Sequence, residues 1–242
     1  MLPTLTLTID LHVHTNYSHD GHDSVERIIE SAIAKKLDGI AICDHDTMEG
    51  SYVAREYVAD NNLDLIIIPG IEVTTSKGHL IVLGLEEGME KGLSPEETIR
   101  IARLKEKGKE KKGTVVIIAP HPFHPFRHSI GNLCMHSELD IDAIEIFNSR
   151  YFFGAANEIA RRKAVRRNII AVVGSDAHSA DCVGLATLEV EVEVETEAEQ
   201  KPEPKQKMQV EVEAILRGIK KGKVGIKNCK RTPFWVYFRQ RM

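Results

Sequence analysis

Short apolar runs alternate with helix-like segments along most of this chain. The apolar runs, which we predict to be strands, span residues 5–13, 39–43, 64–73, 80–85, 114–119, 143–147 and 169–174. Helices are predicted over 25–37, 50–61, 95–111 and 155–167, where apolar residues recur at helical spacing or start signals occur. Continuous apolar strands of this kind are typical of a mostly parallel sheet covered by helices on both faces. Six or more such units favour a barrel or a large doubly wound sheet, in which functional residues gather at the carboxyl ends of the strands.

The last quarter of the chain has a different pattern. Residues 188–213 alternate Val and Glu on either side of a polar stretch that holds Pro202 and Pro204. We interpret 188–210 as an exposed insertion that starts from a half-buried strand, and 211–242 as a C-terminal helix and extension. The basic residues between Lys220 and Arg231 are typical of a solvated face, although they could also attract a polyanion. Residues 1–242 are predicted to form one domain.

Composition excludes several classes of protein. Apolar residues make up 42% and charged residues 28% of the 242 residues, which is typical of a globular protein and not of a disordered one. No apolar run reaches the roughly 18 residues that a membrane span needs, and the N-terminus lacks the features of a secretory signal. The net charge of −4 argues against a general nucleic-acid coat protein. The four cysteines form no C-x-x-C pair and are predicted to be buried thiols. We expect a cytoplasmic protein with no membrane span and no obligate protein partner.

Histidines and acids cluster where the predicted strands end. The chain has 11 histidines, of which four fall in residues 12–22 and three in 121–128. Nearly every apolar run delivers a group that can bind a borderline divalent metal. Independent core histidines would not favour strand ends so consistently, so we predict a metal site. Its candidate ligands are His12, His14, His45, Glu72, His79, His121, Asp176 and His178, with His19 or Asp20 as a ninth.

The number of candidate ligands predicts more than one metal ion. A mononuclear zinc site uses three or four protein ligands, whereas nine suit two or three ions with a bridging carboxylate. With neutral histidines, Glu72 and Asp176 contribute two negative charges, and three divalent ions would contribute six positive ones. The site would therefore attract an anion, and a phosphoryl group that spans the metals is the natural one.

Six motifs resemble those of the PHP (polymerase and histidinol phosphatase) superfamily. They are D-L-H-V-H-T (10–15), C-D-H-D-T (43–47), G-I-E-V (70–73), G-H-L-I-V-L-G (78–84), A-P-H-P (119–122) and G-S-D-A-H (174–178). The resemblance implies a distorted (β/α)7 TIM-like barrel of the α/β class with a trinuclear centre of Zn, Mn or Fe. It implies one metal on His12, His14, Glu72 and Asp176, a second on Glu72, His79 and His121, and a third on His19, His45 and His178. The family often has Asp where this chain has His19, so Asp20 stays an alternative.

The resemblance is strongest to the stand-alone phosphoesterases of this superfamily. It implies hydrolysis of phosphate esters of nucleotides, or of 5′ ends of short oligonucleotides, by a metal-activated hydroxide. Asp44, which would orient a ligand imidazole, and His178 are the candidate catalytic residues. Arg127, Asn148 and Arg150 are candidates for binding the substrate phosphate, because the planar guanidinium of an arginine matches phosphate oxygens.

Three alternatives remain at this stage. A histidinol-phosphatase-like phosphomonoesterase would share the metals but need a pocket for a small amino alcohol. An amidohydrolase also begins with H-x-H on a barrel strand, but usually lacks the D-H-D and G-I-E motifs. A non-catalytic PHP-like scaffold would typically have lost ligands, and none is missing from this sequence.

Overall fold

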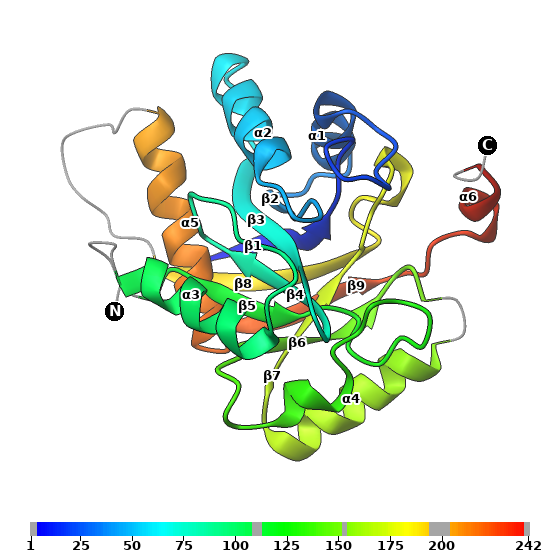
Figure 1. The fold of residues 1–242 in the computed structure, drawn as a ribbon. Coiled ribbons are helices and arrows are strands. Elements are labelled where there is room, and N and C mark those ends of the chain that lie inside the picture. Colours follow the sequence, from blue (N-terminus) through cyan, green and yellow to red (C-terminus); the bar gives the residue numbers. More distant parts are fainter. Residues whose placement is uncertain (1–3, 108–112, 152–153, 194–203, 240–242) are drawn as a thin grey trace.

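The computed structural model describes residues 4–107, 113–151, 154–193 and 204–239. In that part of the chain, nine strands form one sheet: β1 (Thr4–Val13), β2 (Gly39–Ile42), β3 (Ile66–Thr75), β4 (Gly78–Leu83), β5 (Val116–Ala119), β6 (Ala143–Asn148), β7 (Ile170–Gly174), β8 (Ala186–Glu193) and β9 (Val224–Cys229). The helices are α1 (Val25–Ala34), α2 (Glu49–Asp60), α3 (Pro95–Lys107), α4 (Ala155–Arg167), α5 (Pro204–Lys220) and α6 (Phe234–Arg239), with short 3-10 turns η1 (Gly131–Met135) and η2 (Ala180–Cys182). In Figure 1 the strands occupy the centre, with α1 and α2 on one side and α4 on the other.

The sheet curls into a nearly closed barrel. The strand order is β7-β6-β5-β4-β3-β2-β1-β8-β9. The segment after β7 returns to β1, where His14 N donates to Ala177 O at 2.8 Å and Ala177 N donates to His12 O at 3.2 Å. The predicted barrel of the α/β class is therefore confirmed, and its closure brings the ends of β1 and β7 together.

The expectation of a mostly parallel sheet is wrong for the middle of the barrel. β4 runs antiparallel to both β3 and β5, whereas β1-β2-β3 and β5-β6-β7 are parallel. Thr75 pairs with Gly78, so β3 and β4 form a tight hairpin. A hairpin leaves no chain for the crossover helix that parallel neighbours require, and β4 is therefore reversed.

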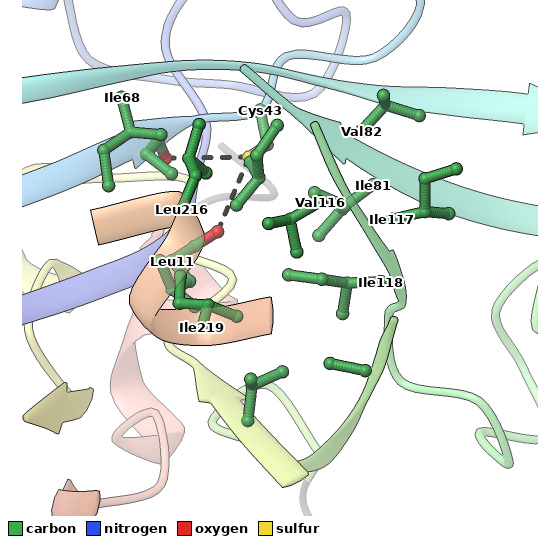
Figure 2. Packing of buried hydrophobic residues seen from close by; sticks show 14 of the residues in the cluster. Leu11, Cys43, Ile68, Ile81, Val82, Val116, Ile117, Ile118, Leu216 and Ile219 are labelled. Carbon is green, nitrogen blue, oxygen red and sulfur yellow. Dashed lines mark hydrogen bonds between the residues drawn. The ribbon is translucent and has the colours of Figure 1, made fainter. Parts of the chain in front are cut away.

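Two clusters of buried apolar residues form the core, and the larger one joins the strands to α3 and α5. Figure 2 shows Leu216 and Ile219 of α5 facing Leu11 and Ile68 from the strands. Each such fully buried side chain contributes about 1.5–3 kcal/mol by leaving water. Lys220, the last residue of α5, donates from Nζ to Val115 O at 2.9 Å, just before β5 begins. Helix α5 thus packs at the end of the barrel where β5 starts, which leaves the ends of the parallel strands for the site.

The C-terminal quarter is more integrated than an insertion. Residues 188–193 belong to β8, which pairs antiparallel with β1. The alternation of Val and Glu follows from the strand, whose valines face the core and whose glutamates face solvent. Residues 194–203 lie outside the described residues, and α5 begins at Pro204. The basic run is partly neutralised by β8, since Lys221 and Lys223 pair with Glu193 and Lys227 pairs with Glu189.

Two smaller expectations can be compared with the structure. Cys43, Cys134 and Cys182 are free and buried as predicted, but Cys229 at the end of β9 is exposed. The expectation for that cysteine is wrong because β9 is the outer strand of the sheet. Among the described residues, no helix is long and apolar enough to cross a membrane.

Candidate metal centre

The ends of the strands converge on one buried cluster of imidazoles and carboxylates. His12 and His14 lie two residues apart on and just after β1, so strand alternation directs both to one face. Their Nε2 atoms are 3.0 Å apart and both side chains are buried. His121 follows β5 and Asp176 follows β7, both with left-handed backbone at φ of 30° and 52°. Such a conformation costs a non-glycine residue about 1–3 kcal/mol and is concentrated at functional sites.

Glu72 lies at the centre of the cluster. Its Oε2 atom is 3.0 Å from His12 Nε2 and 3.1 Å from His14 Nε2. Its Oε1 atom is 2.9 Å from His79 Nδ1 and 3.0 Å from His121 Nε2. One carboxylate therefore contacts four imidazoles, two with each oxygen, which is the arrangement of a bridging ligand.

Three groups of ligand atoms surround Glu72, and within each group all atoms lie within 4.8 Å of one another. The groups are His12, His14 and Asp176; His45, Glu72 and His79; and His14, Asp20, His45 and His178. His14 and His45 each belong to two groups, so the three are contiguous. His178 Nε2 lies 2.8 Å from Asp20 Oδ2 in the third group.

The donor atoms fit divalent cations. The buried Nδ1 atoms of His45 and His79 and Oδ1 of Asp176 have no hydrogen-bond partner. His79 Nδ1 is close to Glu72 Oε1, but the two are not in hydrogen-bonding geometry. An unsatisfied buried polar atom costs about 1–3 kcal/mol, and metal coordination removes this cost when lone pairs face a shared point. Nitrogen and carboxylate donors in this number suit Zn, Mn or Fe, so the cluster has the donor set of a divalent metal site.

Burial keeps most of these imidazoles neutral and able to bind a metal. It lowers the pKa of His14 to about 3 and that of His121 to about 4, and it holds the pKa of His178 well below its usual range. Burial also opposes a charge on His12, but the Glu72 and Glu145 carboxylates outweigh it and raise the pKa of His12 to about 9. The negative potential that attracts a proton to His12 in the metal-free protein would equally attract a cation.

Glu145 is a residue that the sequence reasoning missed. It lies on β6, is buried, and its Oε1 is 3.0 Å from His12 Nδ1. Its Oε2 accepts the His121 backbone N–H at 2.7 Å. A carboxylate behind an imidazole fixes the ring's tautomer and leaves Nε2 free for a metal. Glycine is needed at Gly174, since a Cβ there would lie 2.3 Å from Glu145 Oε1. The available signal was an acid in the middle of an otherwise apolar strand.

His14 and His178 are held in a similar way from behind. His14 Nδ1 lies 3.2 Å from Ser18 Oγ, and His178 Nδ1 lies 2.9 Å from the Asp176 carbonyl oxygen. The other ring nitrogen of His178, Nε2, lies 2.8 Å from Asp20 Oδ2, so both ring nitrogens have an oxygen partner. His178 thus lies among the candidate ligand residues of the third group.

Of the two candidates for the ninth ligand, the structure brings Asp20 into the cluster. Asp20 contacts His178 as described, and its Oδ1 lies 3.9 Å from His45 Nε2. Although burial raises it, the pKa of Asp20 is lowered by the hydrogen bond from His178 and by nearby imidazoles. His19 is exposed, and its ring centroid is 5.0 Å from that of His45. Of the adjacent residues His19 and Asp20 in S-H-D-G, it is thus Asp20 whose side chain lies in the cluster.

Asp44 has a different role from the predicted one of orienting an imidazole. Its two oxygens accept from Thr15, at 2.6 Å from the backbone N–H and 2.7 Å from the hydroxyl. Burial raises its pKa to about 6, and the Thr15 hydrogen bonds oppose the rise. A Cβ on Gly50 would lie 2.0 Å from Asp44 Oδ2, so the glycine of D-H-D-T-x-x-G lets α2 pack against this carboxylate. Asp44 therefore fixes the loop that follows His14.

The three predicted phosphate-binding residues separate into two kinds. Arg127 Nη1 contacts Asp176 Oδ2, and Arg150 Nη1 lies 3.7 Å from Asp20 Oδ2 and 3.9 Å from Asp176 Oδ1. Both arginines border the cluster. Asn148 is fully buried, and its amide donates to Glu145 and Asp176 while its Oδ1 accepts from Arg150 N. In this geometry the contacts of Asn148 fix the acids of the cluster.

Comparisons with known proteins agree with this geometry. A PHP domain model matches residues 10–107, and a PHP-associated model matches residues 154–224. The protein MJ1587 of Methanocaldococcus jannaschii is 37% identical over 167 residues, which cover 65% of this chain and 91% of that protein. A two-domain protein from Bacteroides vulgatus containing a predicted PHP-like metal-dependent phosphoesterase has a similar fold, with a TM-score of 0.70 at 15% identity over 95% of this chain and 68% of that one.

Two relatives with named activities match shorter stretches. The phosphoribosyl 1,2-cyclic phosphate 1,2-diphosphodiesterase of Eggerthella lenta is 38% identical over 85 residues, 33% of this chain and 31% of that protein. The 5′-3′ exoribonuclease Rnm of Escherichia coli is 39% identical over 66 residues, 27% of this chain and 22% of Rnm. The chain thus spans a third or less of these two relatives. With both family models matched in order, one relative covered almost end to end and the fold shared, the chain belongs to the PHP superfamily of phosphoesterases.

Proposed function

We propose that this protein is a metal-dependent phosphoesterase that hydrolyses phosphate esters of nucleotides or the 5′ ends of short oligonucleotides. The observation that carries the proposal is the convergence of nine ligand-type side chains, with Glu72 at their centre and two arginines at the border of the same cluster. A cation cluster next to fixed guanidinium groups suits a substrate whose reacting group is a phosphoryl group.

We assign three divalent ions to the cluster, as Zn, Mn or Fe. The first would be held by His12, His14, Glu72 and Asp176, the second by Glu72, His79 and His121, and the third by Asp20, His45 and His178. The shared position of Glu72 supports a bridging role, and the three contiguous groups of ligand atoms support the number. This assignment differs from the sequence-based one in using Asp20 where His19 was expected.

The chain's own residues would orient the substrate and the metal ligands. When bound, the cations would supply a water nucleophile at neutral pH and offset the charge on the phosphoryl oxygens. Arg127 and Arg150 would bind two of those oxygens, because guanidinium groups donate hydrogen bonds in a planar fork. Glu145 would hold His12, and Asn148 would hold Asp176, so that neither ligand has to reorganise as charge develops.

The nucleotide part of the proposal is supported by the two relatives with named activities, one of which acts on a phosphoribosyl cyclic phosphate and the other on RNA. These relatives match about a third of this chain or less. The proposal therefore covers both a nucleotide and a 5′-phosphorylated oligonucleotide, and substrate length is decided by experiment.

The test is hydrolysis of a substrate panel by the full chain with added Mn²⁺, together with elemental analysis of the same sample. The panel holds nucleoside mono- and bisphosphates, short 5′-phosphorylated RNA and DNA, and histidinol phosphate. We expect turnover of nucleotides or oligonucleotides that is lost on chelation and in His12→Ala. His136→Ala, a change at an exposed histidine, is the matched control and should retain it.

Three other outcomes would change or refute the proposal. Turnover of histidinol phosphate alone would replace the nucleotide substrate by a small amino alcohol ester. Full metal content without any turnover would refute the substrate class. A protein that takes up no metal and has no activity would refute the proposal in favour of a non-catalytic scaffold.

A further inference from the structure

The C-terminal segment of residues 230–237 packs against the loop that carries Arg150. Lys230 N donates to Leu185 O at 2.7 Å, and Thr232 N donates to Ser149 O at 2.9 Å. In Figure 1 this segment runs from β9 to α6. It lies outside both ranges matched by the family models, which end at residues 107 and 224. It is therefore a part of this chain that the family pattern does not explain.

The segment is anchored at two buried residues that precede Tyr237. Thr232 is buried, and so is Val236, which belongs to the same apolar cluster as Val13 and Ala177. Val13 and Ala177 are neighbours of metal-ligand residues in the sequence. These two buried residues and the hydrogen bond of Thr232 to the loop fix the chain just before Tyr237.

Tyr237 holds one side of Arg150, and Asn148 holds the other. The Tyr237 hydroxyl donates to the Arg150 carbonyl oxygen at 2.7 Å. The Arg150 backbone N–H donates to Asn148 Oδ1 at 3.0 Å, and the Asn148 amide donates to Asp176 Oδ2 at 3.0 Å. Both peptide groups of Arg150 are therefore fixed, one to the metal-binding acids and one to the C-terminal segment.

The Arg150 side chain has an unused donor in the site. Its Nη1 atom is buried and has no hydrogen-bond partner among the described residues, although two carboxylates lie within 4 Å. Burial and the neighbouring Arg127 lower the pKa of Arg150 to about 10, so the guanidinium stays charged at neutral pH. A buried charged donor without a partner is ready to bind an anionic oxygen.

We propose that Tyr237, through its hydrogen bond to the Arg150 carbonyl, positions the Arg150 guanidinium for a phosphoryl oxygen of the substrate, so that the C-terminal segment is part of the substrate site. This inference rests on the proposed phosphoesterase function. Tyr237 is a positioning residue, since it acts through Arg150 and contacts none of the metal ligands directly in the described contacts.

The test compares Tyr237→Phe with Tyr52→Phe. Both changes remove a hydroxyl that donates to a backbone carbonyl, and Tyr52 does so to Glu86 O at 2.8 Å, away from the cluster. For Tyr237→Phe we expect KM for the substrate and Kd for inorganic phosphate to rise about three- to tenfold, the loss typical of one hydrogen bond. The value of kcat and the metal content should stay within about twofold, because the ligands keep their own supports. Tyr52→Phe should leave all four quantities unchanged.

A double-mutant cycle separates positioning from a general structural effect. In an Arg150→Ala background, Tyr237→Phe should cause no further rise in KM or phosphate Kd. The inference is overturned if the two changes multiply, if Tyr237→Phe has no effect in the wild-type chain, or if it lowers metal content. If the wild-type protein hydrolyses nothing in the panel, the proposed function fails, while phosphate Kd measured on the metal-loaded protein still decides the positioning role. Wild-type protein that binds no phosphate would overturn it.

Discussion

Glu145 reaches two ligands of the metal cluster from one side chain, through the His12 ring and the His121 backbone N–H. Glu145→Gln keeps the shape but removes the charge that fixes the His12 tautomer. We expect affinity for the metal to fall about 10- to 100-fold, the usual cost of losing such a partner. Competition with a metal chelator measures this. Glu189→Gln on β8, where the carboxylate only pairs with Lys227, is the control and should bind metal normally. Equal affinities for the two variants would contradict the role.

We expect substitution of Asp20 and substitution of His19 to have different effects on binding of the third metal. Asp20 belongs to a group of ligand atoms with His14, His45 and His178, whereas His19 is exposed. Asp20→Ala should therefore reduce the bound metal by about one ion per chain, and His19→Ala should leave it unchanged. Elemental analysis after gel filtration gives both numbers. The reverse result would restore His19 as the ligand and make Asp20 a surface acid.

At the scale of single residues, the sequence predicted which side chains converge better than what each one does. Alternation along β1 and the position of Glu72 on β3 are local properties, so the motifs were sufficient to bring those ligands together. The partners of Asn148 and Asp44 depend on chain segments that are distant in sequence. The sequence around Asn148 does not indicate that the Asn148 amide donates a hydrogen bond to Asp176, 28 residues away.

Among the elements, the α1–η2 contact supports the loop that follows His178. Lys35, at the C-terminal end of α1, donates from Nζ to the carbonyl oxygens of Ala180, Asp181 and Val183 at 2.7–3.1 Å. Because this side chain is partly exposed, we expect Lys35→Met to lower the free energy of unfolding by only about 1–2 kcal/mol. Urea unfolding of the metal-free protein measures this value.

The neighbouring lysine provides the control for that experiment. Lys36→Met changes the same side-chain type one residue later, at an exposed position. It should shift the urea midpoint little. If Lys35→Met were as stable as Lys36→Met, the three carbonyl contacts would contribute nothing to holding η2 against α1.

Element boundaries were predicted well where a strand or helix has one clear pattern, and poorly where direction matters. The apolar run at 80–85 was correctly predicted as a strand, yet hydrophobicity carries no information on whether it runs parallel to its neighbour. The two-residue turn between Thr75 and Gly78 decides this. Gly78 itself has a positive φ of 142°, and a Cβ there would lie 2.4 Å from Ile130 N. The length of the connection between β3 and β4 therefore predicts the direction of β4 better than hydrophobicity does.

At the scale of the whole molecule, metal binding joins strands from around the barrel. The ligands come from β1, β3 and β4 and from the segments after β2, β5 and β7, so the unfolded chain cannot present them together. A ligand that binds only the folded state at a concentration of 100 times its Kd stabilises that state by about 2.7 kcal/mol. For a chain of this size that corresponds to a rise in Tm of about 5–10 °C.

We therefore expect Mn²⁺ or Zn²⁺ to raise the Tm of the metal-free protein by at least that amount, as measured by calorimetry, and a chelator to reverse the rise. Asp176→Asn should reduce the shift, because it removes a charge from a group that spans β1 and β7, whereas His136→Ala should retain it in full. A metal-dependent Tm that is the same in Asp176→Asn and in the wild-type chain would place the stabilising ion elsewhere. Because closure of the barrel depends on the contact between β1 and the segment after β7, the loss in Asp176→Asn also tests whether the cations help to close the barrel.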